Sequence, residues 1–194
     1  MIAYARRRAR ELGLAALATF AAAEMADFAR FIKVEPSSVS LAFNPINTIR
    51  HLGSDRAMLA HFQQIAAALR PGGVYAVGLS LFAPGVEGPT EDVWQARRGP
   101  VHVKQIVEYE PAAWRRADGT RNPVRRERVA STLIVTRGRG KDRSERQLDD
   151  SYWLRSYTRS QWTTLIAKSA LRLLASVDGV GQPHDPGELG YAIW

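Results

Sequence analysis

The residues best suited to metal or acid–base chemistry in this sequence are its four histidines. None of them stands at a metal-ligand spacing such as that of HExxH. His61 falls within a predicted helix that has an ordinary apolar face, so we interpret it as a packed or surface side chain. The chain has no cysteine, which excludes disulfides, thiolate nucleophiles and cysteine metal sites. We predict no metal site and favour a chemistry that needs neither a metal nor a strong nucleophile.

Other motifs that carry chemistry are missing or weak. The sequence has no G-x-S-x-G nucleophile elbow, and no carboxylate pair stands out for glycoside or proton-transfer chemistry. The segment RGRGK at residues 137–141 lacks the spacing of a phosphate-binding loop. We interpret this segment as a basic hairpin turn.

The composition is typical of a globular protein with a sizeable core, because 45% of the 194 residues are apolar and 24% are charged. No stretch approaches the roughly 18 apolar residues of a membrane span. The arginines near the N-terminus are not followed by an apolar segment and a small-residue cleavage site. We expect a cytoplasmic protein with no membrane partner and a single domain over residues 1–194.

The positive charge is concentrated in one segment. The net charge is +8, and residues 97–146 account for all of it, with 14 Lys or Arg and 6 Asp or Glu. A basic segment of this kind can attract nucleic acid or an anionic substrate. The alternative is an arginine-rich surface that is simply solvated.

The chain opens on a predicted amphipathic helix. Ile2, Ala5, Ala9 and Leu12 fall on one face at helical spacing, so we expect this face to pack on a core. Gly13 supplies a stop signal at the C-terminal end. We interpret the alanine-rich stretch over residues 16–28 as a strand that ends near Glu24 and Met25.

The next elements predict a strand–helix–strand crossover. Residues 39–43 form a short apolar run that is typical of a buried parallel strand. Ser54 is a plausible N-cap for a helix over residues 55–70, which Pro71, Gly72 and Gly73 end. A second apolar strand follows at residues 74–82. A crossover of this kind implies that the two strands pair in parallel.

The composition and the apolar pattern of the chain change after residue 82. We predict a loop rich in Pro and Gly at residues 83–100, and then an antiparallel meander with one solvated face. Thr158 and Gln161 form a capping box that opens a helix. The expected strands of these two regions are residues 101–111, 124–138 and 149–157 in the meander, and residues 171–179 and 189–194 at the end of the chain.

This order of elements resembles the class I S-adenosylmethionine-dependent methyltransferases. Three stretches carry the resemblance: MIAYARRRARELGL, AAAEMADF, and AFNPINTIRHLGSDRAMLAHFQQIAAALRPGGVYAVGLSL. The last is the most specific, because its Asn-x-x-Asn phrase and its Leu-x-Pro-Gly-Gly turn stand at the family spacing. The resemblance implies an α/β fold with a Rossmann-like methyltransferase sheet, incomplete at the N-terminus, and an antiparallel β meander inserted after the fifth strand. Residues 1–82 would form the cofactor side, residues 83–157 the loop and acceptor-side meander, and residues 158–194 the closing helix and strands.

The resemblance also implies the cofactor S-adenosylmethionine and a set of residues around it. Glu24 would face the adenine amino group with the Met25 backbone beside it, and Phe43 and Asn44 would border the methionine part. Asn47 and His51 would face cofactor or acceptor. His51 is a candidate proton acceptor, or else an ordinary polar residue at the start of a helix.

The meander would then cover the acceptor, which we expect to be a small molecule. The four candidates to line this side could equally be packed strand residues with an exposed arginine: Tyr152, Trp153, Arg155 and Tyr157.

The family's first strand, glycine-rich loop and second strand would all precede the opening helix, and the sequence contains none of them. We therefore expect an N-terminally truncated methyltransferase that by itself binds S-adenosylmethionine weakly or not at all. The third strand would pair directly with the fourth, or the inner strand edges would be exposed. Two other readings are a non-catalytic methyltransferase-like binding module and an RNA-directed methyltransferase that uses the basic segment.

Overall fold

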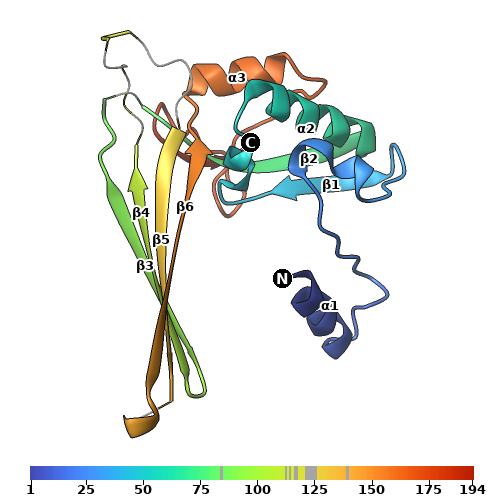
Figure 1. Ribbon diagram of the computed structural model, residues 1–194. Coiled ribbons are helices and arrows are strands. Elements are labelled where there is room, and N and C mark those ends of the chain that lie inside the picture. Colours follow the sequence, from blue (N-terminus) through green and yellow to red (C-terminus); the bar gives the residue numbers. More distant parts are fainter. Residues whose placement is uncertain (84, 112, 114, 116–117, 121–125, 139) are drawn as a thin grey trace.

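The computed structural model describes residues 1–83, 85–111, 113, 115, 118–120, 126–138 and 140–194. The strands of these residues form two sheets, one mixed and one antiparallel. The antiparallel sheet extends away from the mixed sheet as a long ribbon (Figure 1). The mixed sheet has the order β1-β2-β7, formed by β1 (Val39–Asn44), β2 (Leu69–Leu81) and β7 (Gly190–Ile193). The antiparallel sheet has the order β3-β4-β5-β6, formed by β3 (Thr90–Arg98), β4 (Val101–Glu110), β5 (Arg126–Arg137) and β6 (Ser144–Arg155).

The predicted crossover is confirmed. β1 and β2 pair in parallel, with Leu41 opposite Val74 and Asn44 opposite Val77. The helix between them is α2 (Asp55–Ala68), and the Ser54 side chain accepts a hydrogen bond from the Ala57 amide as an N-cap. The carboxyl ends of β1 and β2 therefore lie side by side, where open α/β sheets bind their ligands.

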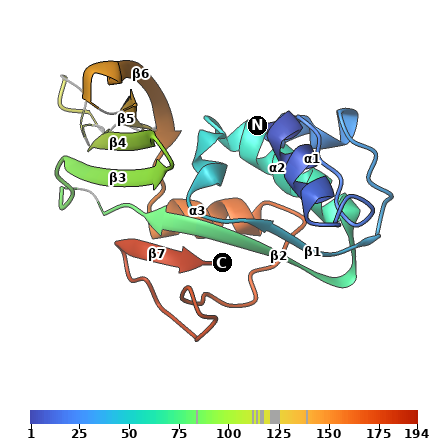
Figure 2. The ribbon, with the colours of Figure 1, turned by 90° about the horizontal axis from the view of Figure 1, so that it is seen from below.

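The main core lies between one face of the mixed sheet and two helices, α2 and α3 (Arg159–Ala167). Both helices lie on the same side of the sheet (Figures 1 and 2). The predicted capping box is present at the start of α3, with the Thr158 and Gln161 side chains bonding reciprocally to the backbone. The largest fully buried side chains of this core are Phe62, Tyr157, Trp162, Ile49 and Met58.

The antiparallel sheet confirms the meander and corrects its extent. Residues 90–98, predicted as loop, form β3 and pair with β4 along their whole length. Every residue of β3 is exposed, so no buried alternation marks this strand in the sequence, and pairing with β4 is what makes it extended. A small core of Val107, Val129 and Leu154 holds the sheet where it meets the rest of the protein.

The N-terminal region differs most from prediction. The helix α1 (Ile2–Glu11) is present, and Gly13 follows it at a φ of +71°. Its apolar face does not join the core, since only Ala9 is buried and Leu12 is 58% exposed. In Figure 1, α1 lies apart from the sheet, on the side opposite α2 and α3.

Two predicted strands are wrong. The alanine-rich stretch contains the 3-10 helix η1 (Met25–Arg30) and no strand, because it lacks the alternation and β-branched residues that hold a strand against a neighbour. β1 is consequently an edge strand of its sheet. Residues 171–179 contain only a bridge at Val177, whereas the predicted last strand is confirmed as β7.

Two other short 3-10 helices are η2 (Thr48–His51) and η3 (Gly140–Asp142).

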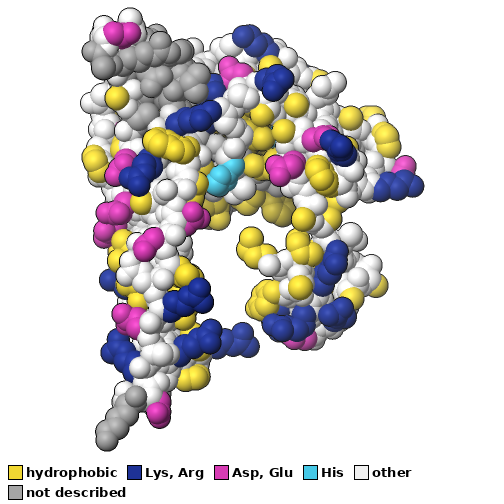
Figure 3. All heavy atoms as spheres, viewed as in Figure 1, with side chains coloured by type: hydrophobic (Ala, Val, Ile, Leu, Met, Phe, Trp, Pro, Cys, Tyr) yellow, Lys and Arg dark blue, Asp and Glu magenta, His cyan; other side chains and the backbone are white. Residues whose placement is uncertain are grey.

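The basic segment belongs mainly to the antiparallel sheet. Figure 3 shows Lys and Arg side chains along the free end of this sheet and on α1. Among the described residues, no helix has the length and apolar character needed to cross a membrane. Four arginines of the basic segment lie outside the described residues: Arg116, Arg121, Arg125 and Arg139.

Candidate functional site

The loop that follows β1 is held in a strained conformation at the carboxyl edge of the sheet. Ile46 and Asn47 have φ values of +55° and +60°, in the left-handed region that only Asn and Gly adopt readily. The Asn47 side chain accepts a hydrogen bond from the Ser80 amide at 2.7 Å and donates one to the Ser80 hydroxyl at 2.9 Å. These two bonds fix the loop to the end of β2. Backbone strain of this kind is concentrated at functional sites.

A polar cavity of about 260 Å³ opens beside this loop. Residues at the carboxyl end of β2 form one side of the cavity, and residues of β3, β4 and β5 form another. Eleven residues line it: Asn47, Arg50, Ser80, Leu81, Phe82, Glu87, Thr90, Asp92, Tyr109, Glu127 and Ser156.

Arg50 on η2 joins the two sheets at the back of the cavity. Its guanidinium donates to the Glu127 carboxylate at 2.7 Å and to the Ser156 hydroxyl at 3.2 Å. A third bond, of 2.9 Å, reaches the backbone carbonyl of Arg155. The Arg50 and Glu127 side chains are only 9% and 13% exposed, so each charge is compensated by the other in a poorly hydrated place.

The cavity has an acidic balance in a basic protein. Its charged lining side chains are one arginine and three carboxylates, those of Glu87, Asp92 and Glu127. The Tyr109 hydroxyl lies among these groups, and burial, followed by the charge of Asp92, raises its pKa. A cavity with an excess of carboxylates favours a cationic ligand.

A second polar arrangement lies on the helix side of the β1 end, and it connects Met25 with Asn44. The Asn44 amide donates to the Met25 sulfur at 3.4 Å. His61 of α2 is 4% exposed, and its ring nitrogens lie 2.7 Å from the Met25 carbonyl and 2.7 Å from the Tyr75 hydroxyl. Burial lowers the pKa of His61 and raises that of Tyr75. His61 is a packed residue, as the sequence indicates.

Gln64, one turn further along α2, holds the rest of η1. Its amide nitrogen donates to the Ala26 carbonyl at 2.8 Å, and its oxygen accepts from the Ala29 amide at 2.8 Å. Glu24 directly precedes η1 and is exposed, with no ion-pair partner among the described residues. Two side chains of α2 therefore place Glu24 and Met25 beside the end of β1.

The other predicted cofactor and catalytic residues are distributed differently. Phe43 is 73% exposed and, by strand alternation, points away from the face that Asn44 occupies. Asn47 lines the polar cavity. His51 does not line this cavity, and its ring packs against Tyr152 with the centroids 5.2 Å apart.

The predicted acceptor-side residues, which lie on β6 and just after it, do not line the polar cavity. Tyr152 and Trp153 are exposed, the latter by 57%. Arg155 is buried and pairs with Asp55 of α2. Tyr157 is fully buried in the main core, and burial raises its pKa to about 12. The acceptor roles of these four residues stay predictions.

Sequence reasoning missed the residues that build the cavity, in particular Arg50, Asp92, Tyr109 and Glu127. Arg50 and Glu127 are 77 positions apart, and no local pattern connects them. The only sequence signal for a site residue here was that Arg50 follows closely on a strand end, where α/β sheets bind ligands. Among the described residues, no three His, Cys, Asp or Glu side chains gather as a metal site.

No family model matches this chain, and no curated protein matches it. Solved structures do match. A methyltransferase from Clostridium acetobutylicum, described as S-adenosylmethionine-dependent, has a TM-score of 0.65 at 12% identity, over 98% of this chain and 68% of its own. DesVI from Streptomyces venezuelae has a TM-score of 0.67 at 17% identity, over 98% and 68%.

A third similar structure is CalS10 from Micromonospora echinaspora, an amino pentose methyltransferase solved with S-adenosylmethionine bound. Its TM-score is 0.56 at 18% identity, over 95% of this chain and 69% of its own. The fold of this protein is that of the class I S-adenosylmethionine-dependent methyltransferases, and the resemblance seen in the sequence is confirmed at the level of fold. Its parallel pair β1–β2 and its antiparallel sheet are the two parts of that fold which build the candidate site.

Proposed function

We propose that this chain takes part in the transfer of a methyl group from S-adenosylmethionine to an amine-bearing small molecule held in the polar cavity. The observation that carries the proposal is the acidic lining of a cavity at the carboxyl edge of the parallel strands. Ligands of open α/β sheets bind at this edge. The proposal is supported by the fold shared with methyltransferases, one of which acts on an amino pentose.

The residues beside the end of β1 suit one part of the cofactor. Glu24 offers an exposed carboxylate that can accept hydrogen bonds from an exocyclic amine, and Met25 is held next to it. The side-chain oxygen of Asn44 is buried and has no hydrogen-bond partner among the described residues, which is unusual for a native polar atom. In this proposal Glu24, Met25 and Asn44 hold the cofactor, which supplies a methyl group on a sulfonium with a thioether as leaving group.

The chain's own contribution is binding, orientation and the removal of a proton. Glu127 is engaged by Arg50, whereas Asp92 has no ion-pair partner among the described residues. Asp92 is therefore the carboxylate we assign to the acceptor. An amine must be neutral to attack a methyl carbon, and Asp92 can accept the proton that its ammonium form loses.

The test measures transfer of label from S-adenosylmethionine carrying a radioactive methyl group, with primary amino sugars and the matching hydroxyl sugars as acceptors. We expect label in the amines only. Asp92→Asn should lower the transfer at least about tenfold, since general-base contributions are larger than that. Glu91→Gln is the matched control, because Glu91 neighbours Asp92 on β3 but does not line the cavity.

Binding of S-adenosylhomocysteine is measured in parallel by saturation-transfer NMR, which detects weak ligands. Binding that Asn44→Ala abolishes supports the cofactor side of the proposal. Label in hydroxyl sugars, or equal loss in the Asp92 and Glu91 variants, contradicts the amine assignment. A loss in His51→Gln with normal transfer in Asp92→Asn would instead assign the proton acceptor to His51. Cofactor binding without any transfer would favour the non-catalytic binding module.

A further inference from the structure

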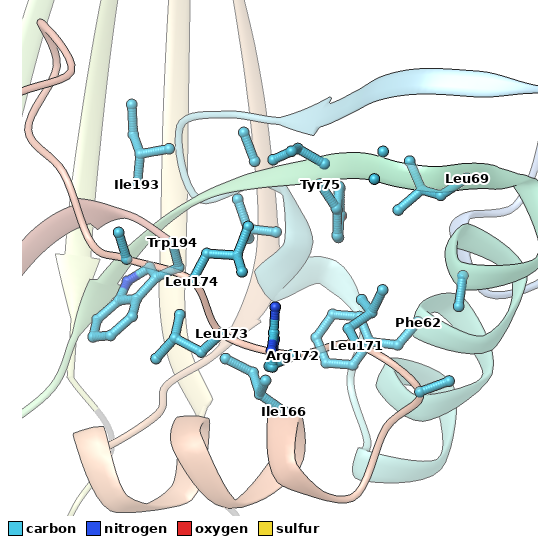
Figure 4. Close-up of a pocket in the computed structure, with 18 of the residues that line it drawn as sticks. Phe62, Leu69, Tyr75, Ile166, Leu171, Arg172, Leu173, Leu174, Ile193 and Trp194 are labelled. Carbon is cyan, nitrogen blue, oxygen red and sulfur yellow. The ribbon is translucent and has the colours of Figure 1, made fainter.

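A second cavity, much larger than the first, lies on the helix side of the mixed sheet. It occupies about 660 Å³ under the amino-terminal half of β2, between α2, α3 and the segment 170–175 (Figure 4). It shares no lining residue with the polar cavity. Its volume is in the range of about 300–1,000 Å³ that small-molecule sites have. The cavity is therefore a separate candidate for a ligand, independent of the proposed methyl transfer.

The walls of this cavity are predominantly apolar. In Figure 4, Phe62 of α2, Ile166 of α3 and Leu171 surround the space below β2. Leu174 is 65% exposed and Leu173 is 40% exposed, so the mouth of the cavity is also apolar. Large apolar side chains that border an open cavity are typical of a surface that an apolar ligand covers.

The charged side chains on the cavity wall are basic. Among the described lining residues they are Arg70 and Arg172, and no Asp, Glu, Lys or His side chain lines the cavity. Arg70 donates to the Ser40 hydroxyl at 2.9 Å. Arg172 is exposed, lines the cavity and has no ion pair or hydrogen bond among the described residues. An arginine beside apolar walls favours an anionic group such as a carboxylate.

Two further donors on the wall lack a partner. The indole nitrogens of Trp162 and Trp194 are buried, and neither makes a hydrogen bond among the described residues. Trp194 lies beside Leu174 at one side of the cavity (Figure 4). Buried donors are nearly always paired in native proteins, so this N–H is an independent sign that a polar atom of a ligand belongs there.

We propose that the helix-side cavity binds an amphipathic carboxylate, that is, an aliphatic chain with an anionic head group. The chain would lie against Phe62, Ile166 and Leu171. The Arg172 guanidinium would pair with the carboxylate, and the Trp194 N–H is available to an oxygen of the ligand. The size, the apolar walls and the arginine side chains support this chemistry together.

The test uses the full chain and a fluorescent aliphatic acid, dansyl-undecanoic acid, as the probe. We expect saturable fluorescence enhancement with one site per chain and displacement by dodecanoate. Dodecanol and dodecylamine have the same chain with a neutral or cationic head, and we expect each to compete at least about tenfold less well, the worth of one charge-assisted hydrogen bond. An excess of S-adenosylhomocysteine should displace none of the probe, because none of the residues assigned to the cofactor lines the helix-side cavity.

Two variants locate the site. Arg172→Gln should weaken probe binding about tenfold, and Arg146→Gln on the exposed part of β6 is the matched control that should leave it unchanged. Trp194→Phe keeps an apolar ring and removes only the N–H, so a smaller loss is expected. Equal affinity for dodecylamine, several probe molecules per chain, or an unchanged affinity in Arg172→Gln would each overturn the proposal. Circular dichroism of every variant confirms that the fold is retained.

Discussion

The Nε2 atom of His61 lies 2.7 Å from the hydroxyl of Tyr75, and the direction of this hydrogen bond is determined. The other ring nitrogen, Nδ1, lies 2.7 Å from the backbone carbonyl of Met25. A carbonyl can only accept, so Nδ1 carries the hydrogen of the neutral ring. Nε2 must then accept, and the Tyr75 hydroxyl donates to it. One neutral imidazole thus connects α2, β2 and η1.

This relationship predicts a pH dependence of stability. Because burial lowers the pKa of His61 below its ordinary 6.5, the unfolded chain binds the proton more readily than the folded one. The stabilising contribution of the neutral ring is complete above pH 6.5 and is lost as the pH falls from there toward the lower pKa of the folded state. Urea denaturation between about pH 7.5 and about pH 5 measures this loss.

His61→Gln should flatten this part of the pH profile, even though the variant is less stable at every pH. His184→Gln, at an exposed position, is the control and should keep the slope of the unmodified protein. A slope that persists in His61→Gln would contradict the assignment, because another group would then be responsible.

The Arg50–Glu127 pair should be the most sensitive ionic contact of the protein. Arg50→Gln leaves the carboxylate of Glu127 in a poorly hydrated place without its partner, and breaking a buried pair in this way costs about 3 kcal/mol or more. Arg128→Gln breaks the pair with Glu110, whose side chains are 43% and 55% exposed, and should cost less than about 1 kcal/mol. Chemical denaturation of both variants gives the comparison. Similar losses would show that the Arg50 pair is solvated.

Asn47 combines an unusual backbone conformation with two side-chain bonds, and two substitutions separate these effects. Asn47→Ala should lose about 3 kcal/mol, since Ala strains at a φ of +60° and both bonds to Ser80 are removed. Asn47→Gly accepts the conformation freely and should lose only about 2 kcal/mol. The order of the two denaturation midpoints is the measurement. A Gly variant less stable than the Ala variant would contradict this account.

The capping box of α3 offers a prediction from local structure alone. Thr158→Ala removes the hydroxyl that accepts from the Gln161 amide at 3.2 Å, and an N-cap of this kind contributes about 1 kcal/mol. Thr158→Ser keeps the hydroxyl and should retain most of the stability. Thermal unfolding followed by circular dichroism compares the two. Equal melting temperatures for the Ala and Ser variants would show that the cap contributes nothing.

Features that depend on residues near one another in the chain were predictable. The N-cap at Ser54, the capping box at Thr158 and Gln161, and the strand β1 with its parallel partner β2 all agree with the sequence analysis. In each case the deciding interactions span a few residues, or follow from an apolar period that local sequence displays. The fold class followed from their order.

Contacts between segments far apart in the chain decided the features that the sequence did not predict. β3 has no buried face, so only its pairing with β4 defines it as a strand, while the alanine-rich stretch before η1 found no strand partner and did not become one. The polar cavity exists because the antiparallel sheet meets the carboxyl edge of the mixed sheet. This contact brings Arg50 to Glu127, which is 77 positions away in the sequence. By itself the sequence determined the caps, the helices and the β1–α2–β2 crossover, because these depend on residues near one another in the chain. Only the tertiary structure decided which charges meet, because that depends on contacts between distant segments.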